Sequence, residues 1–182
     1  MSKGKKYYNK WQDNNTLIGI FIGSNDVNDI NYINNNKNIT ENMNDIIDII
    51  FNTIENMYNV GIRNFMIINI PPFDLSPVNA KNKRPFYKHE VPMFNNALNE
   101  NSKSLYWKFN DINIIVYDNY NEYKYIMENF KLYNFKSKTD SWYFNKNDKM
   151  DNYFWRDFTH ISNKGHKILA EDINDLLSSI NK

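Results

Sequence analysis

Asp157 and His160 stand three positions apart near the carboxyl end of the chain. At this spacing the carboxylate can accept the Nδ1–H of the imidazole and leave Nε2 free to act as a general base. Taken alone, the pair is equally typical of a polar surface turn. The other two histidines, His89 in a basic loop and His166 in the last expected helix, are typical of exposed residues without a chemical role.

A second candidate group follows the apolar run over residues 17–22. It consists of Gly23, Ser24, Asn25 and Asp26. An asparagine just past a buried strand can direct its NH₂ group into a cleft and stabilise an oxyanion, and loss of such a donor typically costs on the order of 10²–10³ in rate. The competing interpretation is an ordinary turn that ends the strand, since Asn and Asp are common turn residues.

The pattern of apolar residues predicts the elements that must position these groups. Short apolar runs predict buried strands over residues 17–22, 65–70 and 112–117. Helical spacing predicts helices over residues 41–60, 91–109 and 120–130, and a last helix that Ser162 or Asn163 caps. The stretches 28–40, 73–90 and 142–155 are expected to be irregular.

This alternation of strands and helices predicts an α/β fold with a parallel sheet and right-handed crossovers. Ligands of such sheets bind beyond the carboxyl ends of the strands, which is where Asn25 is expected. We expect a single domain over residues 1–182, with a disordered leader over residues 1–10.

Composition excludes several classes of function. A formal charge of +1, from 22 basic and 21 acidic residues, gives no reason to expect a nucleic-acid partner. The sequence has no cysteine, so it has neither a disulfide framework nor a thiolate metal site. No apolar run reaches the roughly 18 residues that a membrane span needs, and the basic start of the chain is not followed by the apolar core of a secretory signal.

Five segments in a fixed order resemble the SGNH/GDSL family of serine ester hydrolases, and its fungal carbohydrate-esterase members in particular. They are Trp11 with the residues that lead into Leu17, the Gly-x-Asn-Asp block at 23–26, the Asn-x-Pro-Pro block within 69–77, the strand end at 116–118, and the segment 155–160 that ends in Asp-x-x-His. Each motif is weak by itself. Together they cover nearly the whole chain.

The resemblance implies a three-layer αβα sandwich of the flavodoxin-like type. It implies that His160 is the general base, that Asp157 orients it, and that Gly23 and Asn25 belong to the oxyanion loop. It also implies an acyl or acetyl ester as substrate, a carbohydrate ester among the candidates, and neither a metal nor an organic cofactor. Secreted members of the family would place the parent protein outside the cell.

The chain departs from the family pattern at the nucleophile. The Gly-Asp-Ser block of the family precedes the Gly-x-Asn-Asp block by many tens of residues, whereas only 22 residues precede Gly23 here. Ser2 follows no strand, and Ser24 occupies the variable position of the oxyanion block. We therefore expect the N-terminal strands of the sandwich to be missing from this chain, and the chain alone to be inactive.

The missing strands affect the expected partners of the chain, and an alternative function is also compatible with its composition. The strand at residues 17–22 would be an exposed edge, which predicts either self-association or a complementing N-terminal segment as partner. The alternative to an esterase is a non-catalytic remnant that binds carbohydrate or another protein, because the aromatic content of 16% permits sugar stacking as well as core packing.

Overall fold

The computed structural model describes residues 12–30, 36–81 and 87–180 of the chain. Trp11 and the expected leader over residues 1–10 lie outside these described residues. The chain divides into two compact units. The first comprises residues up to Ile70 together with Pro92–Tyr117, and the second comprises Pro71–Val91 together with the residues from Asp118 onward. The expectation of a single domain stays a prediction.

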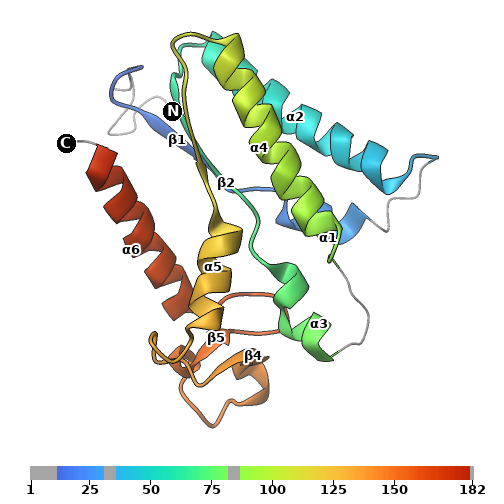
Figure 1. The fold of residues 1–182 in the computed structure, drawn as a ribbon, viewed down its shortest axis with the longest axis vertical. Coiled ribbons are helices and arrows are strands. Elements are labelled where there is room, and N and C mark those ends of the chain that lie inside the picture. The colour runs from blue at the N-terminus through green and yellow to red at the C-terminus, as the bar shows by residue number, and fades with distance from the viewer. Residues whose placement is uncertain (1–11, 31–35, 82–86, 181–182) are drawn as a thin grey trace, which may run out of the picture. The chain divides into compact units, whose positions relative to one another are not determined.

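The first unit contains a parallel sheet of three strands in the order β1-β2-β3 (Figure 1). The strands are β1 (Leu17–Ile20), β2 (Asn64–Ile68) and β3 (Asn113–Tyr117). Each strand coincides with the apolar run that predicted it, with bounds shifted by at most two residues. The α/β class with parallel strands, as in an αβα sandwich, is therefore confirmed.

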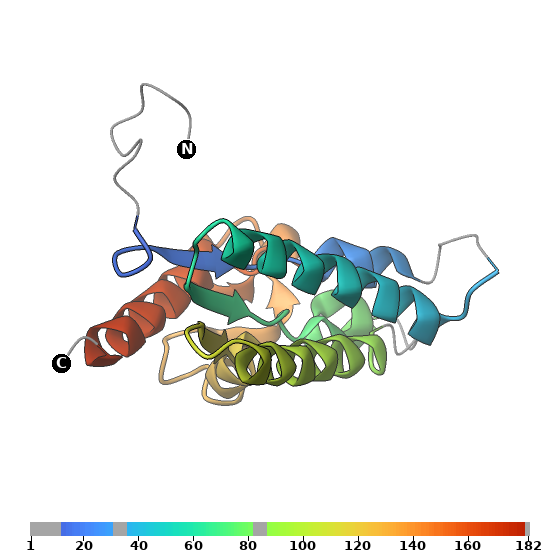
Figure 2. The same cartoon turned by 90° about the horizontal axis from the view of Figure 1, so that it is seen from above.

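Two long helices connect these strands, α2 (Ile39–Asn59) and α4 (Glu90–Lys108) (Figure 2). An ion pair of 2.6 Å between Glu55 and Lys108 joins their carboxyl ends. Tyr58, next to the end of α2, stacks on Phe109, just past α4, with ring centroids 4.0 Å apart. Because the two crossover helices touch each other, they cover the same face of the sheet, as consecutive right-handed crossovers require.

The bounds of α2 follow from local chemistry. The Asn38 side chain accepts the backbone N–H of Glu41, and the Glu41 side chain accepts the N–H of Asn38, which is a complete capping box. The apolar residues at helical spacing, Ile47, Ile50 and Ile54 among them, form its buried face. Gly61, with φ of 104°, occupies the left-handed position just past the helix, where a side chain would be strained.

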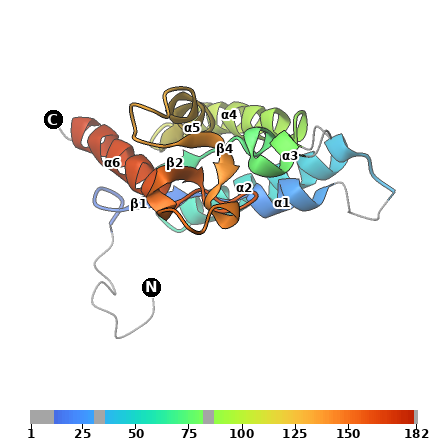
Figure 3. The same cartoon turned by 90° about the horizontal axis from the view of Figure 1, so that it is seen from below.

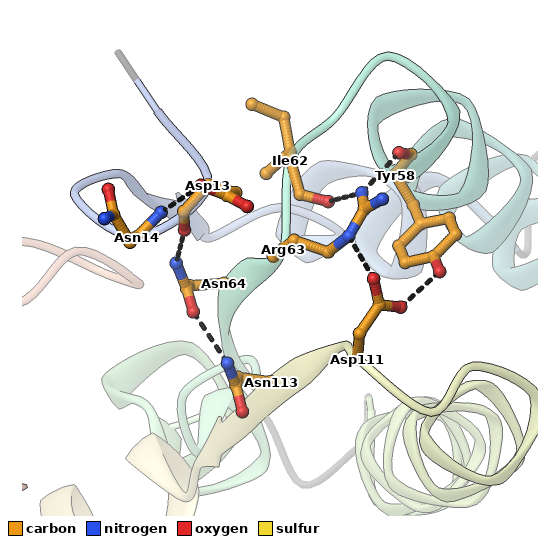
Figure 4. Close-up of polar contacts among 8 residues, drawn as sticks. All are labelled: Asp13, Asn14, Tyr58, Ile62, Arg63, Asn64, Asp111 and Asn113. Atoms are coloured by element: carbon orange, nitrogen blue, oxygen red, sulfur yellow. Dashed lines mark hydrogen bonds and ion pairs between the residues drawn. The ribbon is translucent and has the colours of Figure 1, made fainter.

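Polar side chains fix the amino ends of β2 and β3 (Figure 4). Asn64 is the first residue of β2, and its amide donates to the carbonyls of Asp13 and Thr16. Asn113, the first residue of β3, donates to Asn64 Oδ1 at 2.8 Å. These bonds tie the segment before β1 to β2, and through Asn64 to β3, at the end of the sheet opposite to Asn25.

The same end of the sheet carries a second polar group (Figure 4). Arg63 donates from Nε to Asp111 at 2.7 Å and lies over the Tyr58 ring, with 4.1 Å between guanidinium carbon and centroid. The Tyr58 hydroxyl donates to the same carboxylate. Both bonds lower the pKa of Asp111, the tyrosine bond being the larger cause. This cluster links the connection between α2 and β2 to the loop between α4 and β3.

The second unit contains the last two helices, α5 (Asn119–Glu128) and α6 (Asn163–Ile180), which pack on each other (Figure 3). Both were predicted. Ser162 caps α6, because its hydroxyl accepts the backbone N–H of Gly165 at 3.3 Å and its carbonyl accepts the N–H of His166. Of the two predicted caps, Ser162 is therefore the correct one.

Short elements depart from the sequence predictions. The residues 23–26 were expected to form a turn, but helix α1 (Ser24–Asp29) begins there, since Val27 and Ile30 bury their side chains. The stretches 73–90 and 142–155, expected to be irregular, contain α3 (Pro77–Lys81) and β5 (Tyr153–Trp155). The strand β5 pairs in parallel with β4 (Ser137–Ser141), which the apolar pattern does not predict. The helices α1 and α3 have six and five residues, which is fewer than two helical turns, so no helical period can be read for them from sequence.

Candidate active site

The loop between β5 and α6 carries the Asp-x-x-His segment and is closed at its base. The N–H of Arg156 donates to the carbonyl of His160 at 2.8 Å, and the N–H of Ser162 donates to the carbonyl of Phe154 at 2.8 Å. Trp155 and Ile161 form an antiparallel bridge, and both are buried. The loop therefore emerges from an anchored base that fixes the positions of its two ends.

Within this loop, Asp157 and His160 contact each other directly. The imidazole Nδ1 lies 2.9 Å from Asp157 Oδ1 and 3.0 Å from Oδ2. An ionised carboxylate can only accept, so Nδ1 is the donor and Nε2 carries the lone pair. The His160 side chain is 75% exposed, which leaves Nε2 accessible to a reacting group.

The Asp157 carboxylate also accepts two backbone bonds. The N–H groups of His160 and Thr159 donate to Oδ1 at 2.9 and 3.1 Å. Partial burial is the largest single influence on the Asp157 pKa and acts to raise it, but these bonds and the His160 ring together outweigh burial and lower the pKa. The aspartate is therefore ionised at neutral pH and available to balance a positive charge on the imidazole.

Helix α6 packs closely against the base of the loop. A Cβ atom added at Gly165 would lie 2.4 Å from the Cγ2 atom of Ile161 and 3.6 Å from the ring of Phe154. Only glycine admits this approach. The close contact holds Ile161, the residue after the histidine, against the first turn of the helix.

The other histidines lack a carboxylate contact of this kind among the described residues. His166 Nδ1 lies 3.3 Å from the Tyr123 hydroxyl. Partial burial of its ring, and then the nearby His160, lower the His166 pKa. His89 is exposed. The contact with an ionised aspartate distinguishes His160 from both.

A half-buried acid in the second unit was not singled out from sequence. Asp74, in the segment that follows Pro71-Pro72, accepts a hydrogen bond of 3.0 Å from the Tyr120 hydroxyl. Burial raises the pKa of Asp74 and, together with the Asp74 charge, raises the pKa of Tyr120 to about 12. No sequence signal joined these two residues, because 45 other positions separate them.

The oxyanion candidates lie in the first unit. Gly23 has φ of 105°, and the ring of Phe94 occupies the space a side chain would need, only 2.1 Å from an added Cβ. Glycine is therefore required at this position for two independent reasons. Asn25 follows in the first turn of α1 with an exposed side chain, and Ser24 is half-buried. Asn25 and His160 belong to different units, so their convergence on one cleft stays a prediction.

A family model for GDSL-like lipases and acylhydrolases matches residues 2–173 of the chain. The chain belongs to this family. An acetylesterase of Thermothelomyces thermophilus is 31% identical over 81 residues, which are 44% of this chain and 26% of the relative. The matched region thus spans about a quarter of the relative's length.

Membership in the GDSL family supports ester hydrolysis as the general chemistry. Among the residues that the structure describes, no cluster of three or more His, Cys, Asp or Glu side chains could hold a metal ion. Within the same residues, no helix is both long and apolar enough to cross a membrane. The expected roles of Gly23, Asn25, Asp157 and His160 in this GDSL protein stay predictions.

Proposed function

We propose that this chain supplies the base, the orienting acid and one oxyanion donor of a GDSL-type esterase that acts on acyl or acetyl esters. The contact of 2.9 Å between His160 Nδ1 and Asp157 carries the proposal. It directs the free Nε2 of an exposed imidazole away from its carboxylate partner, which is the arrangement a general base requires.

In the proposed reaction, Nε2 of His160 takes the proton of a serine hydroxyl as the serine oxygen attacks the acyl carbon. Asp157 stabilises the resulting imidazolium, and the Asn25 amide donates to the oxyanion of the tetrahedral intermediate. His160 then gives the proton to the leaving alcohol. Water repeats the sequence on the acyl-enzyme, with His160 as base again, and releases the acid.

The nucleophilic serine in this proposal comes from polypeptide outside the 182 residues. The printed sequence contains no Gly-Asp-Ser segment, and the serines that precede Asn25 in it are Ser2 and Ser24. Without a nucleophile, His160 can only assist water. Removal of the nucleophile from a well-studied serine hydrolase costs about 10⁶ in rate, so turnover by the chain alone should be close to background.

A comparison of two proteins tests the proposal with 4-nitrophenyl acetate as substrate. One is the chain alone. The other is a chimera in which the N-terminal region of a GDSL relative, with its Gly-Asp-Ser block, precedes Gln12. We expect turnover from the chimera and background hydrolysis from the chain. Turnover by the chain that Ser24→Ala abolishes would contradict the assignment of the nucleophile.

The second candidate function is a non-catalytic module that binds carbohydrate or a protein partner. The observation that favours it is the set of exposed large apolar residues in and after β1, Leu17, Phe21 and Ile22, which are 40%, 43% and 50% exposed. A chimera that folds, contains all the catalytic residues and still shows no turnover would favour this function over the esterase.

A further inference from the structure

Three large aromatic side chains, Tyr143, Phe144 and Phe158, gather on the surface of the second unit; we call them the aromatic patch. They are 47%, 50% and 43% exposed. Each ring contacts the other two, with centroid separations of 5.4, 5.8 and 5.0 Å. Exposed apolar surface gathered in one place is typical of a binding site, whereas single exposed apolar residues are common everywhere.

The aromatic patch is attached to the loop that carries His160. Phe158 belongs to that loop and precedes His160 by two positions, a separation of at most about 7 Å along the chain. The N–H of Tyr143 donates to the carbonyl of Arg156 at 2.9 Å, and the N–H of Val78 donates to the carbonyl of Phe158 at 3.2 Å. A molecule held at His160 therefore has the aromatic patch within reach.

Polar groups border the aromatic patch on one side. A hollow next to Tyr143 is lined mainly by polar side chains, namely Asn145, Lys146, Asn147 and Asp148 together with the phenol of Tyr153. The Lys146 ammonium lies 4.3 Å from the centroid of the Tyr143 ring. Lys136 and Asn152 bind the Asp148 carboxylate, while Lys146 and Asn147 are exposed.

This combination fits a sugar better than an acyl chain. A pyranose presents C–H groups on its face and hydroxyl groups around its edge, so it can stack on exposed rings and bond to polar side chains beside them. An alkyl chain gains most in an enclosed apolar channel, and here the hollow beside the rings is open and polar.

We propose that the aromatic patch binds a sugar ring of an O-acylated carbohydrate, with its hydroxyl groups on Lys146 and Asn147 and its ester directed toward His160. The inference rests on the proposed esterase function for the role of His160. The aromatic patch thereby selects the alcohol part of the ester, which names carbohydrate esters as the substrate class.

The test measures sugar binding to the full chain, because binding, unlike hydrolysis, does not need the serine nucleophile. The probes are the unacylated hexamers of xylose, glucose, mannose and N-acetylglucosamine, titrated by calorimetry and by NMR of the aromatic side chains. We expect at least one hexamer to bind, and Phe158→Ala and Phe144→Ala each to weaken it by about 3- to 10-fold, the size of one ring contact. Tyr125→Ala, which removes a 53% exposed ring from α5, is the matched control and should leave affinity unchanged.

A second variant separates stacking from general apolar contact. Phe158→Leu keeps an apolar side chain but removes the ring, so it should weaken sugar binding as Phe158→Ala does. His160→Ala should leave sugar affinity unchanged, because the histidine acts on the ester and not on the sugar. Octanoate serves as the acyl probe and should not displace the sugar.

Three results would overturn the proposal. They are no binding of any hexamer up to 10 mM, full sugar affinity in Phe158→Leu and Phe144→Ala, or octanoate binding that depends on the three rings. Failure of the esterase proposal looks different, because the chimera would then lack turnover while the chain still bound the sugar through the aromatic patch.

Discussion

The Nδ1 atom of His160 lies 2.9 Å from Oδ1 of Asp157, and the same oxygen accepts the backbone N–H of His160. The histidine is therefore held at two points by one carboxylate. Rotation of the imidazole about its χ angles would break the ring bond while the backbone bond remained. The aspartate thus acts both as the anchor of the loop and as the group that sets the tautomer of the ring.

Replacement of Asp157 should change the tautomer of His160. In the wild-type chain the carboxylate selects the form with Nδ1–H, and Asp157→Ala should shift the neutral imidazole toward the Nε2–H form that free imidazole side chains favour. Long-range ¹H–¹⁵N spectra of the three histidines measure this directly. Asp151→Ala, an exposed acid six positions earlier, is the control. An unchanged ¹⁵N pattern in Asp157→Ala would show that the carboxylate does not set the tautomer.

The free energy of unfolding should fall in acid, because protonation of Asp148 removes a stabilising ion pair. The Lys136 ammonium is the largest cause that lowers its pKa, to about 2, with help from the N–H of Lys149 and the amide of Asn152. Because the folded pKa is below the unfolded value of 3.8, the unfolded state binds the proton more readily. The contribution is complete above about pH 4 and is lost as pH falls toward 2.

Urea unfolding of Asp148→Asn between pH 2 and 6 checks this. The variant should be less stable than the wild type at pH 6, and the difference should shrink as the pH approaches 2. Asp157 contributes in the same direction, since its pKa is also lowered. A difference that stays constant over the whole range would rule out the Asp148 contacts as its source.

Gly23→Ala should destabilise the chain strongly. The left-handed backbone at Gly23 costs a side chain about 1–2 kcal/mol, and displacement of the Phe94 ring adds about 1–3 kcal/mol. Gly19→Ala in β1 is the matched control, because an added Cβ meets nothing within 4 Å there. Its free energy of unfolding should stay within about 1 kcal/mol of the wild type. Equal losses in the two variants would contradict this account of Gly23.

The edge of the sheet at β1 should promote self-association. Among the described strands β1 pairs with β2 alone, and Phe21 and Ile22 just past it are exposed. An apolar edge without charge or proline is a template for strand pairing. Phe21→Lys should therefore reduce the concentration-dependent shift in size-exclusion chromatography, whereas Ile49→Lys, at a 67% exposed position on α2, should not. A wild-type chain that elutes as a monomer at every concentration would show that the edge is covered.

Long regular elements were predictable from the sequence, and the reason is visible in α2. Its apolar residues recur over 21 positions, so the helical period is unambiguous, and Gly61 marks its end. The three strands β1, β2 and β3 were equally clear because each falls in a short apolar run. The residues 23–26 were assigned to a turn because Asn and Asp are typical of turns, whereas burial of Val27 and Ile30 favours the helix that begins there.

The site was only partly predictable. Spacing alone placed Asp157 within reach of His160, since three residues of loop cannot separate them far. The aromatic patch depends on contacts of Phe158 with residues 14 and 15 positions earlier, Phe144 and Tyr143, and no local pattern encodes them. The aromatic richness of residues 142–155 was the signal available, and it was equally consistent with core packing, as the buried Phe154 and Trp155 show.

The central claim is that His160 is the general base of an esterase. The most direct test compares the kcat of two histidine variants of the chimera on 4-nitrophenyl acetate. His160→Ala should lower kcat by about 10⁴-fold or more, because the serine loses its proton acceptor. His166→Ala, which removes the histidine bonded to Tyr123, should leave kcat within about threefold of the unsubstituted chimera. Equal kcat values for the two variants, or full activity in His160→Ala, would contradict the account.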